Sequence, residues 1–219
     1  EKRLKETMKI MGLKPPVIDM AWFLSMSVQM LVTAVCVTIN LMSGVYTFSS
    51  GILVFVFVLA WGMSVVTLCF LLSVFFSKSK AAATVGPMLF FALYFPYYAV
   101  EDPSTPALPK TLSCIFAPTC MAVTSSVFTS FESGQIGVQV GNIFTTAGNI
   151  SYATCIAMLC FDCVLYAALS VYLDKVLPSE YGLRRHWAYP LAALRDCVCR
   201  RSASQTGGLQ ELSTSLLRA

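Results

Sequence analysis

The sequence predicts an all-α integral membrane protein with four transmembrane helices, an outer re-entrant helical hairpin and a cytoplasmic amphipathic helix at its N-terminal end. Three observations support this fold class. Hydrophobic residues make up 57% of the 219 residues and charged residues 12%, whereas soluble domains carry roughly 25% charged residues. Four apolar runs reach the length of about 20 residues that a helix needs to cross a bilayer. Almost all basic residues gather on one side of these runs.

The first sixteen residues, EKRLKETMKIMGLKPP, form a charged segment that precedes the apolar runs. Leu4, Met8 and Met11 recur at helical spacing and therefore define one apolar face of a helix. Spacing alone favours a helix that lies in the membrane interface. A pair of prolines ends the segment, and residues 17–190 are assigned to a transmembrane domain.

The four spans are predicted at residues 17–42, 52–76, 81–100 and 152–173. The turn-like stretch SGVYTFSSG separates the first two, and the short polar stretch SKSK separates the second from the third. The third run ends in LYFPYY, an aromatic cluster typical of the headgroup level of a membrane. The fourth ends before the charged sequence DKVLPSEYGLRRHW.

Residues 111–131 form a fifth apolar stretch, which is rich in Ser and Thr and is predicted to be broken by Pro118 near its middle. Each half is too short to cross a membrane alone, so we predict two short helices that enter and leave on the outer side. Such a hairpin is tolerated only against protein or a water-filled cavity. A single full crossing is the alternative, and it would move the C-terminal basic residues to the outer side.

The distribution of Lys and Arg indicates the orientation, because these residues accumulate on cytoplasmic loops. With four spans and a hairpin, both chain ends are cytoplasmic and the outer side holds one basic residue, Lys110. The other fourteen fall on the cytoplasmic side: Lys2, Arg3, Lys5, Lys9, Lys14, Lys78, Lys80, Lys175, Arg184, Arg185, Arg195, Arg200, Arg201 and Arg218. Asn149 begins a glycosylation sequon on the predicted outer side and is a candidate glycosylation site.

Three polar side chains lie within the predicted spans: Gln29, Asn40 and Asp162. A carboxylate at mid-membrane is costly, so Asp162 is expected to face protein or water. Two roles remain open for it, a structural hydrogen bond to a neighbouring helix and a contact that helps to gate a pathway. Gln29 and Asn40 indicate interhelical hydrogen bonds, which are worth roughly 0.6 to 2 kcal/mol each.

The nine cysteines show no spacing typical of a metal site, and His186 is the only histidine. No metal site is therefore predicted. Cys114 and Cys120 lie in the predicted hairpin, where they form either a disulfide of an oxidising compartment or two buried thiols. The sequence shows no Ser/His/Asp set and no pair of carboxylates at enzyme-like spacing, so no catalytic residue is predicted.

Several blocks of sequence resemble, in the same order, subfamily A of the ATP-binding cassette transporters, a family of large lipid exporters. The blocks cover most of residues 1–190: EKRLKETMKIMGL, AWFL, FLLSVFFSKSKAAA, LYFPYY, GQIGVQVGNIF, MLCFDCVLYAALSVYLDKVLP and EYGLRRHWAYP. His186 stands before Trp187 where the family usually has Pro, and the similarity fades after Pro190. Residues 191–219 form a polar tail that is predicted to be disordered.

The resemblance implies an ABC-2 type transmembrane domain, of which this chain is the later part, in an ATP-driven transporter of phospholipid or sterol. It implies that residues 1–16 are a coupling helix, whose contacts with a nucleotide-binding domain are Leu4, Glu6, Met8, Met11 and Gly12. The implied partners are the lipid substrate, the nucleotide-binding domains and the other transmembrane half, and no nucleic acid is expected. The implied location is the plasma membrane or an intracellular vesicle membrane.

No phosphate-binding loop of the form G-x-x-x-x-G-K-[ST] occurs in the sequence, so the chain is not expected to hydrolyse ATP by itself. ATP and Mg are expected on nucleotide-binding domains outside this sequence. The alternative function is a truncated, non-transporting scaffold that only associates with partner helices. The few charges within the spans favour an apolar cargo, because a path for a hydrophilic ion needs a polar lining.

Overall fold

The computed structural model describes residues 15–76 and 79–176. The chain divides into two compact units, Glu1–Val171 and Tyr172–Ala219, and every contact given below lies within the first. Most described residues are helical. Besides helices and the loops between them, the described residues form one small antiparallel sheet of β1 (Thr146–Ala147) and β2 (Ile150–Ser151), which follows the 3-10 helix η1 (Val140–Asn142). The prediction of an all-α fold is therefore confirmed for the described part of the chain.

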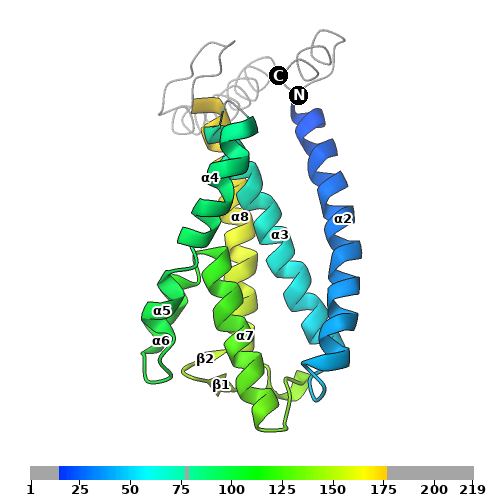
Figure 1. Ribbon diagram of the computed structural model, residues 1–219, viewed down its shortest axis with the longest axis vertical. Helices are drawn as coiled ribbons and strands as arrows, with labels where there is room; N and C mark the ends of the chain where they lie inside the picture. The colour runs from blue at the N-terminus through cyan, green and yellow to red at the C-terminus, as the bar shows by residue number, and fades with distance from the viewer. Residues whose placement is uncertain (1–14, 77–78, 177–219) are drawn as a thin grey trace, which may run out of the picture. The chain divides into compact units, whose positions relative to one another are not determined.

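Within the described ranges, four helices are long and apolar enough to cross a membrane: Val17–Gly44, Gly51–Phe75, Lys80–Val100 and Tyr152–Asp174. This agrees with the four predicted spans. They belong to α2 (Pro15–Gly44), α3 (Gly51–Phe75), α4 (Ser79–Ala92) with α5 (Pro96–Val100), and α8 (Tyr152–Val176). Figure 1 shows that α3 and α8 run in one direction, whereas α2 and α4 run in the other.

The third predicted span is not one continuous helix. α4 ends at Ala92, and α5 begins at Pro96. Proline has no amide hydrogen to donate to the Ala92 carbonyl, and that carbonyl instead accepts a hydrogen bond from the Phe95 amide at 3.2 Å. The bend therefore falls inside the aromatic cluster LYFPYY.

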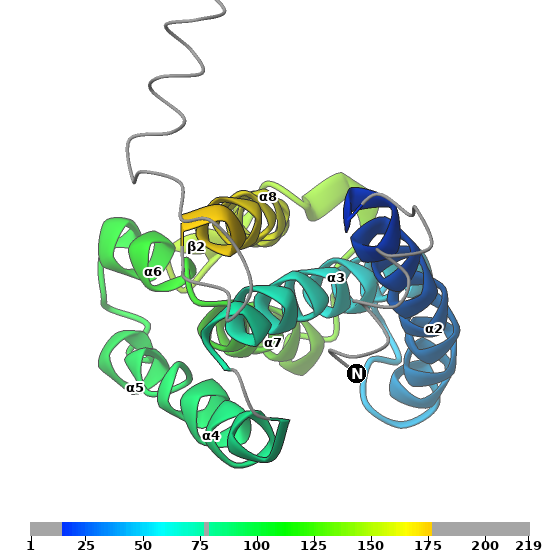
Figure 2. The ribbon, with the colours of Figure 1, turned by 90° about the horizontal axis from the view of Figure 1, so that it is seen from above.

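α3 is the most buried of the four candidate spans. Figure 2 shows it between α2 on one side and α7 (Ala117–Ser133) and α8 on the others. Phe23 of α2 contacts Phe70 of α3 with ring centroids 6.1 Å apart. Farther along the pair, a methyl group added at Gly62 of α3 would overlap the side chain of Met30 on α2. The atom that it would meet first is the terminal methyl of Met30, so Gly62 leaves room for the end of this side chain against α3.

Phe128 of α7 lies at the centre of the buried core and has no exposed surface. Its ring contacts those of Tyr46, Phe57 and Tyr152 at centroid distances of 4.9, 5.5 and 5.5 Å. These three rings come from the α2–α3 loop, α3 and α8. The Tyr152 hydroxyl also donates a 2.9 Å hydrogen bond to the carbonyl of Leu53. The aromatic cluster thus joins the ends at which α3 and α8 begin.

α6 (Ala107–Ser113) and α7 occupy the stretch predicted as a hairpin. The predicted break at Pro118 is wrong, because the turn lies at residues 114–116 and Pro118 occupies the first turn of α7. Proline is favourable there, since its missing amide hydrogen would have no partner within the helix. α7 therefore runs for 17 residues to Ser133, and Figure 1 shows it descending from this turn toward the α2–α3 loop.

Tyr166 of α8 binds the turn between α6 and α7. Its hydroxyl donates a hydrogen bond to the Ile115 carbonyl at 2.7 Å and accepts one from the Ala117 amide at 3.2 Å. Thr119 donates to the carbonyl of Leu93, which follows α4, at 2.7 Å. Helix ends leave backbone groups without partners inside the helix, and the Tyr166 hydroxyl satisfies two of them at this turn.

Candidate functional site

Glu132, near the end of α7, binds the loop between α2 and α3. Its Oε1 atom accepts hydrogen bonds from the Phe48 amide at 2.7 Å and the Thr47 hydroxyl at 3.2 Å, and its Oε2 atom accepts one from the Ser49 hydroxyl at 2.8 Å. We call these four residues the loop junction. Partial desolvation acts to raise the pKa of Glu132, but the hydrogen bonds outweigh it and hold the pKa below its usual value. The carboxylate is therefore ionised at neutral pH.

The residues that follow α7 are tied to the same loop. The Ser49 hydroxyl oxygen accepts a hydrogen bond from the Val138 amide at 3.0 Å, and the Ser50 amide donates to the Val138 carbonyl at 2.8 Å. Gly137 has φ +65°, and a Cβ atom there would overlap the backbone of Phe48. Both the backbone conformation and the close approach require glycine. The loop junction thus extends to the chain after α7.

A cavity of about 130 Å³ lies beside α5, α6, α7 and the β1–β2 turn. Its polar lining consists of Tyr97, Glu101, Lys110, Ser126 and Ser130. Lys110 is only 5% exposed, and its Nζ atom donates a 2.7 Å hydrogen bond to the Gly148 carbonyl. No carboxylate of the described residues forms an ion pair with it. We call this space the Lys110 cavity.

Asn149 and Gly148 form the two-residue turn between β1 and β2, with φ of +68° and +59°. This conformation is typical of tight hairpin turns. The Asn149 side-chain amide donates hydrogen bonds to the carbonyls of Pro103 at 3.2 Å and Thr105 at 3.0 Å. The residue is exposed, but the nitrogen that would carry a sugar is engaged in these bonds. Glycosylation of Asn149 stays a prediction.

Asp162 lies in the middle of α8 and is fully buried. Among the described residues, neither carboxylate oxygen has a hydrogen-bond partner, and neither does the indole nitrogen of Trp61 on α3. Burial without a partner strongly disfavours the charged form of a carboxylate. Asp162 thus faces protein, and its choice between a structural and a gating role stays a prediction.

Gln29 and Asn40 lie on an exposed face of α2. The Asn40 amide donates a hydrogen bond to the Cys36 carbonyl at 2.8 Å, and the Thr33 hydroxyl donates to the Gln29 carbonyl at 2.9 Å. Ala34, which is 1% exposed, lies on the opposite face and packs in the core with α3. The exposed residues, which we call the α2 polar face, recur every three or four positions: Ser25, Gln29, Thr33, Cys36, Asn40 and Ser43. Interhelical hydrogen bonds from this face stay a prediction.

Cys114 and Cys120 are fully buried and carry free thiols. Cys155 of α8 is buried with them, and its carbonyl lies 3.6 Å from the Cys120 sulfur. The structure thus contains buried thiols rather than the disulfide, the other arrangement that the sequence allows. Among the described residues, no group of three or more His, Cys, Asp or Glu side chains is arranged to hold a metal ion.

The predicted coupling-helix contacts Leu4, Glu6, Met8, Met11 and Gly12 lie outside the described residues, as does the predicted tail. Sequence reasoning does not single out Glu132 or Tyr166. Their partners lie 84 and 51 residues away along the chain. Tyr166 does lie in the block MLCFDCVLYAALSVYLDKVLP, but nothing in that block indicates its partner. Lys110 does carry a signal, because it is the one basic residue of the predicted outer side.

Residues 1–172 match the family described as ABC-2 family transporter protein. The chain is 34% identical over 198 residues to the Homo sapiens retinal-specific phospholipid-transporting ATPase ABCA4, a match of 87% of the chain and 9% of that protein. It is 33% identical over 196 residues to the Homo sapiens phospholipid-transporting ATPase ABCA7, with coverage of 87% and 9%. It is 31% identical over 202 residues to the Homo sapiens ATP-binding cassette sub-family A member 2, with coverage of 87% and 8%. The chain therefore spans less than a tenth of the length of these relatives.

Proposed function

The chain belongs to the ABC-2 transporter family as a membrane domain with relatives in subfamily A, and on this premise we propose that it is the membrane-spanning part of an ATP-driven phospholipid or sterol transporter. The family match over residues 1–172 carries this proposal. Two relatives are named as phospholipid-transporting ATPases, which supports lipid as the cargo. The four apolar helices agree with a multi-pass integral membrane protein.

The proposed division of labour places ATP and Mg on nucleotide-binding domains that act together with this chain. The sequence has no phosphate-binding loop, and such a loop is what holds the triphosphate in cassette ATPases. The amphipathic residues 1–16 are proposed as the coupling helix, with Leu4, Met8 and Met11 as the face that meets a nucleotide-binding domain. Movement of that domain would then be transmitted to α2, which follows directly in the chain.

We place both chain ends on the cytoplasmic side and α6–α7 as a re-entrant hairpin on the outer side. The single basic residue of the outer loops, Lys110, supports this orientation. The contacts of the hairpin support it too. Lys110 binds Gly148 shortly before α8, and Glu132 binds Phe48 shortly before α3. Both ends of the hairpin thus lie where α3 and α8 begin, while its turn contacts Tyr166 well inside α8.

The α2 polar face supports a contact with the other transmembrane half. A polar group without a partner in hydrocarbon costs several kcal/mol. The Gln29 side chain is exposed and makes no hydrogen bond with another described residue, so lipid is an unfavourable neighbour for it. A transmembrane helix packed on this face would provide partners for Gln29 and Asn40.

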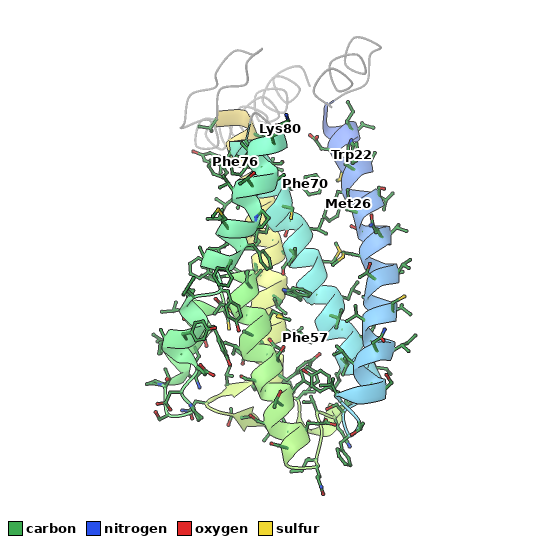
Figure 3. The ribbon with its side chains drawn as sticks, viewed as in Figure 1. Trp22, Met26, Phe57, Phe70, Phe76 and Lys80 are labelled. Atoms are coloured by element: carbon green, nitrogen blue, oxygen red, sulfur yellow. The ribbon has the colours of Figure 1, made fainter. Side chains whose placement is uncertain are left out.

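The remaining surface of α2 is apolar and suits contact with lipid. Leu24 and Leu31, which lie off the α2 polar face, are 66% and 49% exposed. Figure 3 shows Trp22 and Met26 near Phe70 of α3, at the end of the helix pair that is far from Phe57. Transport of an apolar cargo along such a membrane-facing surface needs no sealed aqueous pore, and this is the route that we propose.

The proposal is tested in proteoliposomes that contain the full-length protein with its nucleotide-binding domains. ATP-dependent movement of labelled phosphatidylcholine and of labelled sterol between the leaflets is measured together with ATP hydrolysis. We expect movement of at least one lipid by the parent protein. Replacing Leu4, Met8 and Met11 together by Ala should leave membrane insertion and ATP hydrolysis in place but strongly reduce lipid movement.

A matched control is Met20→Ala, which removes an apolar side chain that is 70% exposed on α2 and lies outside the proposed coupling face. It should move lipid at the parent rate. Normal transport by the triple variant would leave residues 1–16 as a surface anchor only. Absence of lipid movement by the parent protein, with retained binding of partner helices, would instead support the non-transporting scaffold.

A further inference from the structure

We propose that the Lys110 cavity binds the zwitterionic headgroup of a phospholipid, with the phosphate at Lys110 and the headgroup amine at Glu101. The inference rests on the proposed function, in which phospholipid is the cargo. The site itself follows from the side chains that line the cavity.

The Lys110 ammonium forms no ion pair with a carboxylate of the described residues; Asp102 is near enough that the Lys110 charge adds to the Ser104 hydrogen bonds in lowering the pKa of Asp102. An ammonium carries three N–H donors, and among the described residues the Gly148 carbonyl is the one hydrogen-bond acceptor of Lys110, at 2.7 Å. The side chain is 95% removed from solvent, since its exposed fraction is 5%. A buried charge without a paired charge is costly. The cavity that Lys110 lines therefore suits an anionic group that accepts the remaining donors.

Glu101 provides the opposite charge in the same cavity. It caps the C-terminal end of α5 and is exposed, and it forms no ion pair with Lys110 in the described structure. The neighbouring Asp102 is already engaged, because its Oδ1 atom accepts hydrogen bonds from the Ser104 amide at 2.8 Å and hydroxyl at 2.7 Å. The cavity thus keeps one positive and one negative group apart, as a bound zwitterion requires.

The other polar side chains of the cavity suit the same ligand. Tyr97 lines the cavity, and aromatic side chains attract quaternary ammonium groups. Ser126 and Ser130 use their hydroxyl hydrogens on carbonyls of their own helix, at 2.8 Å each, so their oxygens remain acceptors. A purely anionic ligand is less favourable, because Glu101, which lines the cavity, would repel it.

The size and place of the cavity favour a headgroup rather than a whole lipid. Its volume of about 130 Å³ is well below the roughly 300 Å³ at which pockets for drug-sized ligands begin. Acyl chains attached to a bound headgroup would therefore lie outside the cavity.

The test measures phospholipid retained by the purified chain in detergent, by native mass spectrometry. The chain is equilibrated with equal amounts of phosphatidylcholine and phosphatidylglycerol, and phosphocholine and inorganic phosphate serve as soluble competitors. Lys110→Gln should lower retained phosphatidylcholine by roughly tenfold or more, the effect of one hydrogen bond to a charged group. Lys80→Gln is the matched control, because Lys80 is an exposed lysine near the start of α4, a helix that does not line the cavity. This variant should retain the parent amount of phosphatidylcholine.

The second charge is tested with Glu101→Gln. This variant should lose most of the preference for phosphatidylcholine over phosphatidylglycerol, whereas the control Asp102→Asn should keep it. Phosphocholine should compete at lower concentration than inorganic phosphate. Equal competition by the two would show a simple anion site and overturn the zwitterion proposal, as would parent-level retention by Lys110→Gln.

If Lys110→Gln does not fold, the decision falls on Glu101→Gln and on the competitors with the parent chain. An unchanged lipid preference in Glu101→Gln then overturns the proposal. The outcome is separate from that of the proposed function. If the chain binds the headgroup through Lys110 but the full-length protein moves no lipid, the binding site stands and the proposed transport function is overturned. If the full-length protein moves lipid but Lys110→Gln retains phosphatidylcholine at the parent level, the transport function stands and the binding site is overturned.

Discussion

The Ser49 hydroxyl of the α2–α3 loop donates a 2.8 Å hydrogen bond to Oε2 of Glu132 on α7, across 83 residues of sequence. The same serine oxygen accepts the Val138 amide at 3.0 Å. One side chain therefore joins the start of α3, the end of α7 and the chain that follows it. Any displacement of α3 at this end has to carry α7 with it or break these bonds.

Replacing Glu132 by Gln should lower the free energy of unfolding by about 1 kcal/mol. Hydrogen bonds to a charged group are worth roughly 1.5 to 3 kcal/mol, and partial solvent exposure reduces this value. Thermal unfolding in detergent measures the change. Glu101→Gln, measured without added lipid, is the control, because it alters an exposed carboxylate. A double-mutant cycle with Ser49→Ala should show a favourable coupling energy, and strict additivity would contradict the importance of this bond.

The contribution of Glu132 should also depend on pH. Its pKa is held below the usual value in the folded protein, so the stabilisation is present above the unfolded pKa of about 4.3 and is lost as the pH falls through the folded pKa. The difference in unfolding temperature between the parent and Glu132→Gln should thus be largest near neutral pH and shrink below about pH 4. A difference that stays constant from pH 7 to pH 3 would contradict this prediction.

Gly137→Ala should destabilise the protein by about 1 to 3 kcal/mol, the usual cost of a strained backbone position. The residue has φ +65°, and the added methyl group would overlap the backbone of Phe48. Gly141→Ala in the same loop is the matched control, because nothing lies within 4 Å of its Cβ position. Equal unfolding temperatures for the two variants would show that the chain after α7 does not need the close approach.

Tyr166→Phe should destabilise the protein by about 1 to 3 kcal/mol, because it leaves buried backbone groups without a partner. The lost hydroxyl serves the Ile115 carbonyl and the Ala117 amide at the turn between α6 and α7. Tyr98→Phe is the control, since Tyr98 is 64% exposed. Faster hydrogen exchange at the turn in Tyr166→Phe, but not in Tyr98→Phe, would locate the effect. Unchanged exchange would remove Tyr166 as an anchor of the hairpin.

Asp162→Asn should leave the unfolding temperature unchanged or raise it. Both carboxylate oxygens are buried without a partner in the described structure, so the parent side chain gains little from its ability to ionise. Thermal unfolding in lipid nanodiscs, where the membrane surrounds α8, is the measurement. A loss of more than about 1 kcal/mol would indicate an ionised carboxylate with a partner that the described residues do not provide.

Membrane class and the number of spans could be predicted from the sequence, because the apolar length of each run is a local property that the bilayer itself selects. The bend in the third span was also accessible in principle. Pro96 cannot donate to Ala92, and that consequence of proline chemistry needs no tertiary structure. The position of the hairpin turn was less accessible, because Pro118 suits both a helix break and a helix start.

Tertiary structure alone decided which polar residues meet. Glu132 lies beside Ser49, Tyr166 beside Ile115, and Lys110 beside Gly148. Residues far apart in sequence come together only through the packing of α3, α7 and α8 around Phe128. Hydrophobic length is written into each segment by itself, whereas the satisfaction of a buried polar group depends on a partner that another segment supplies.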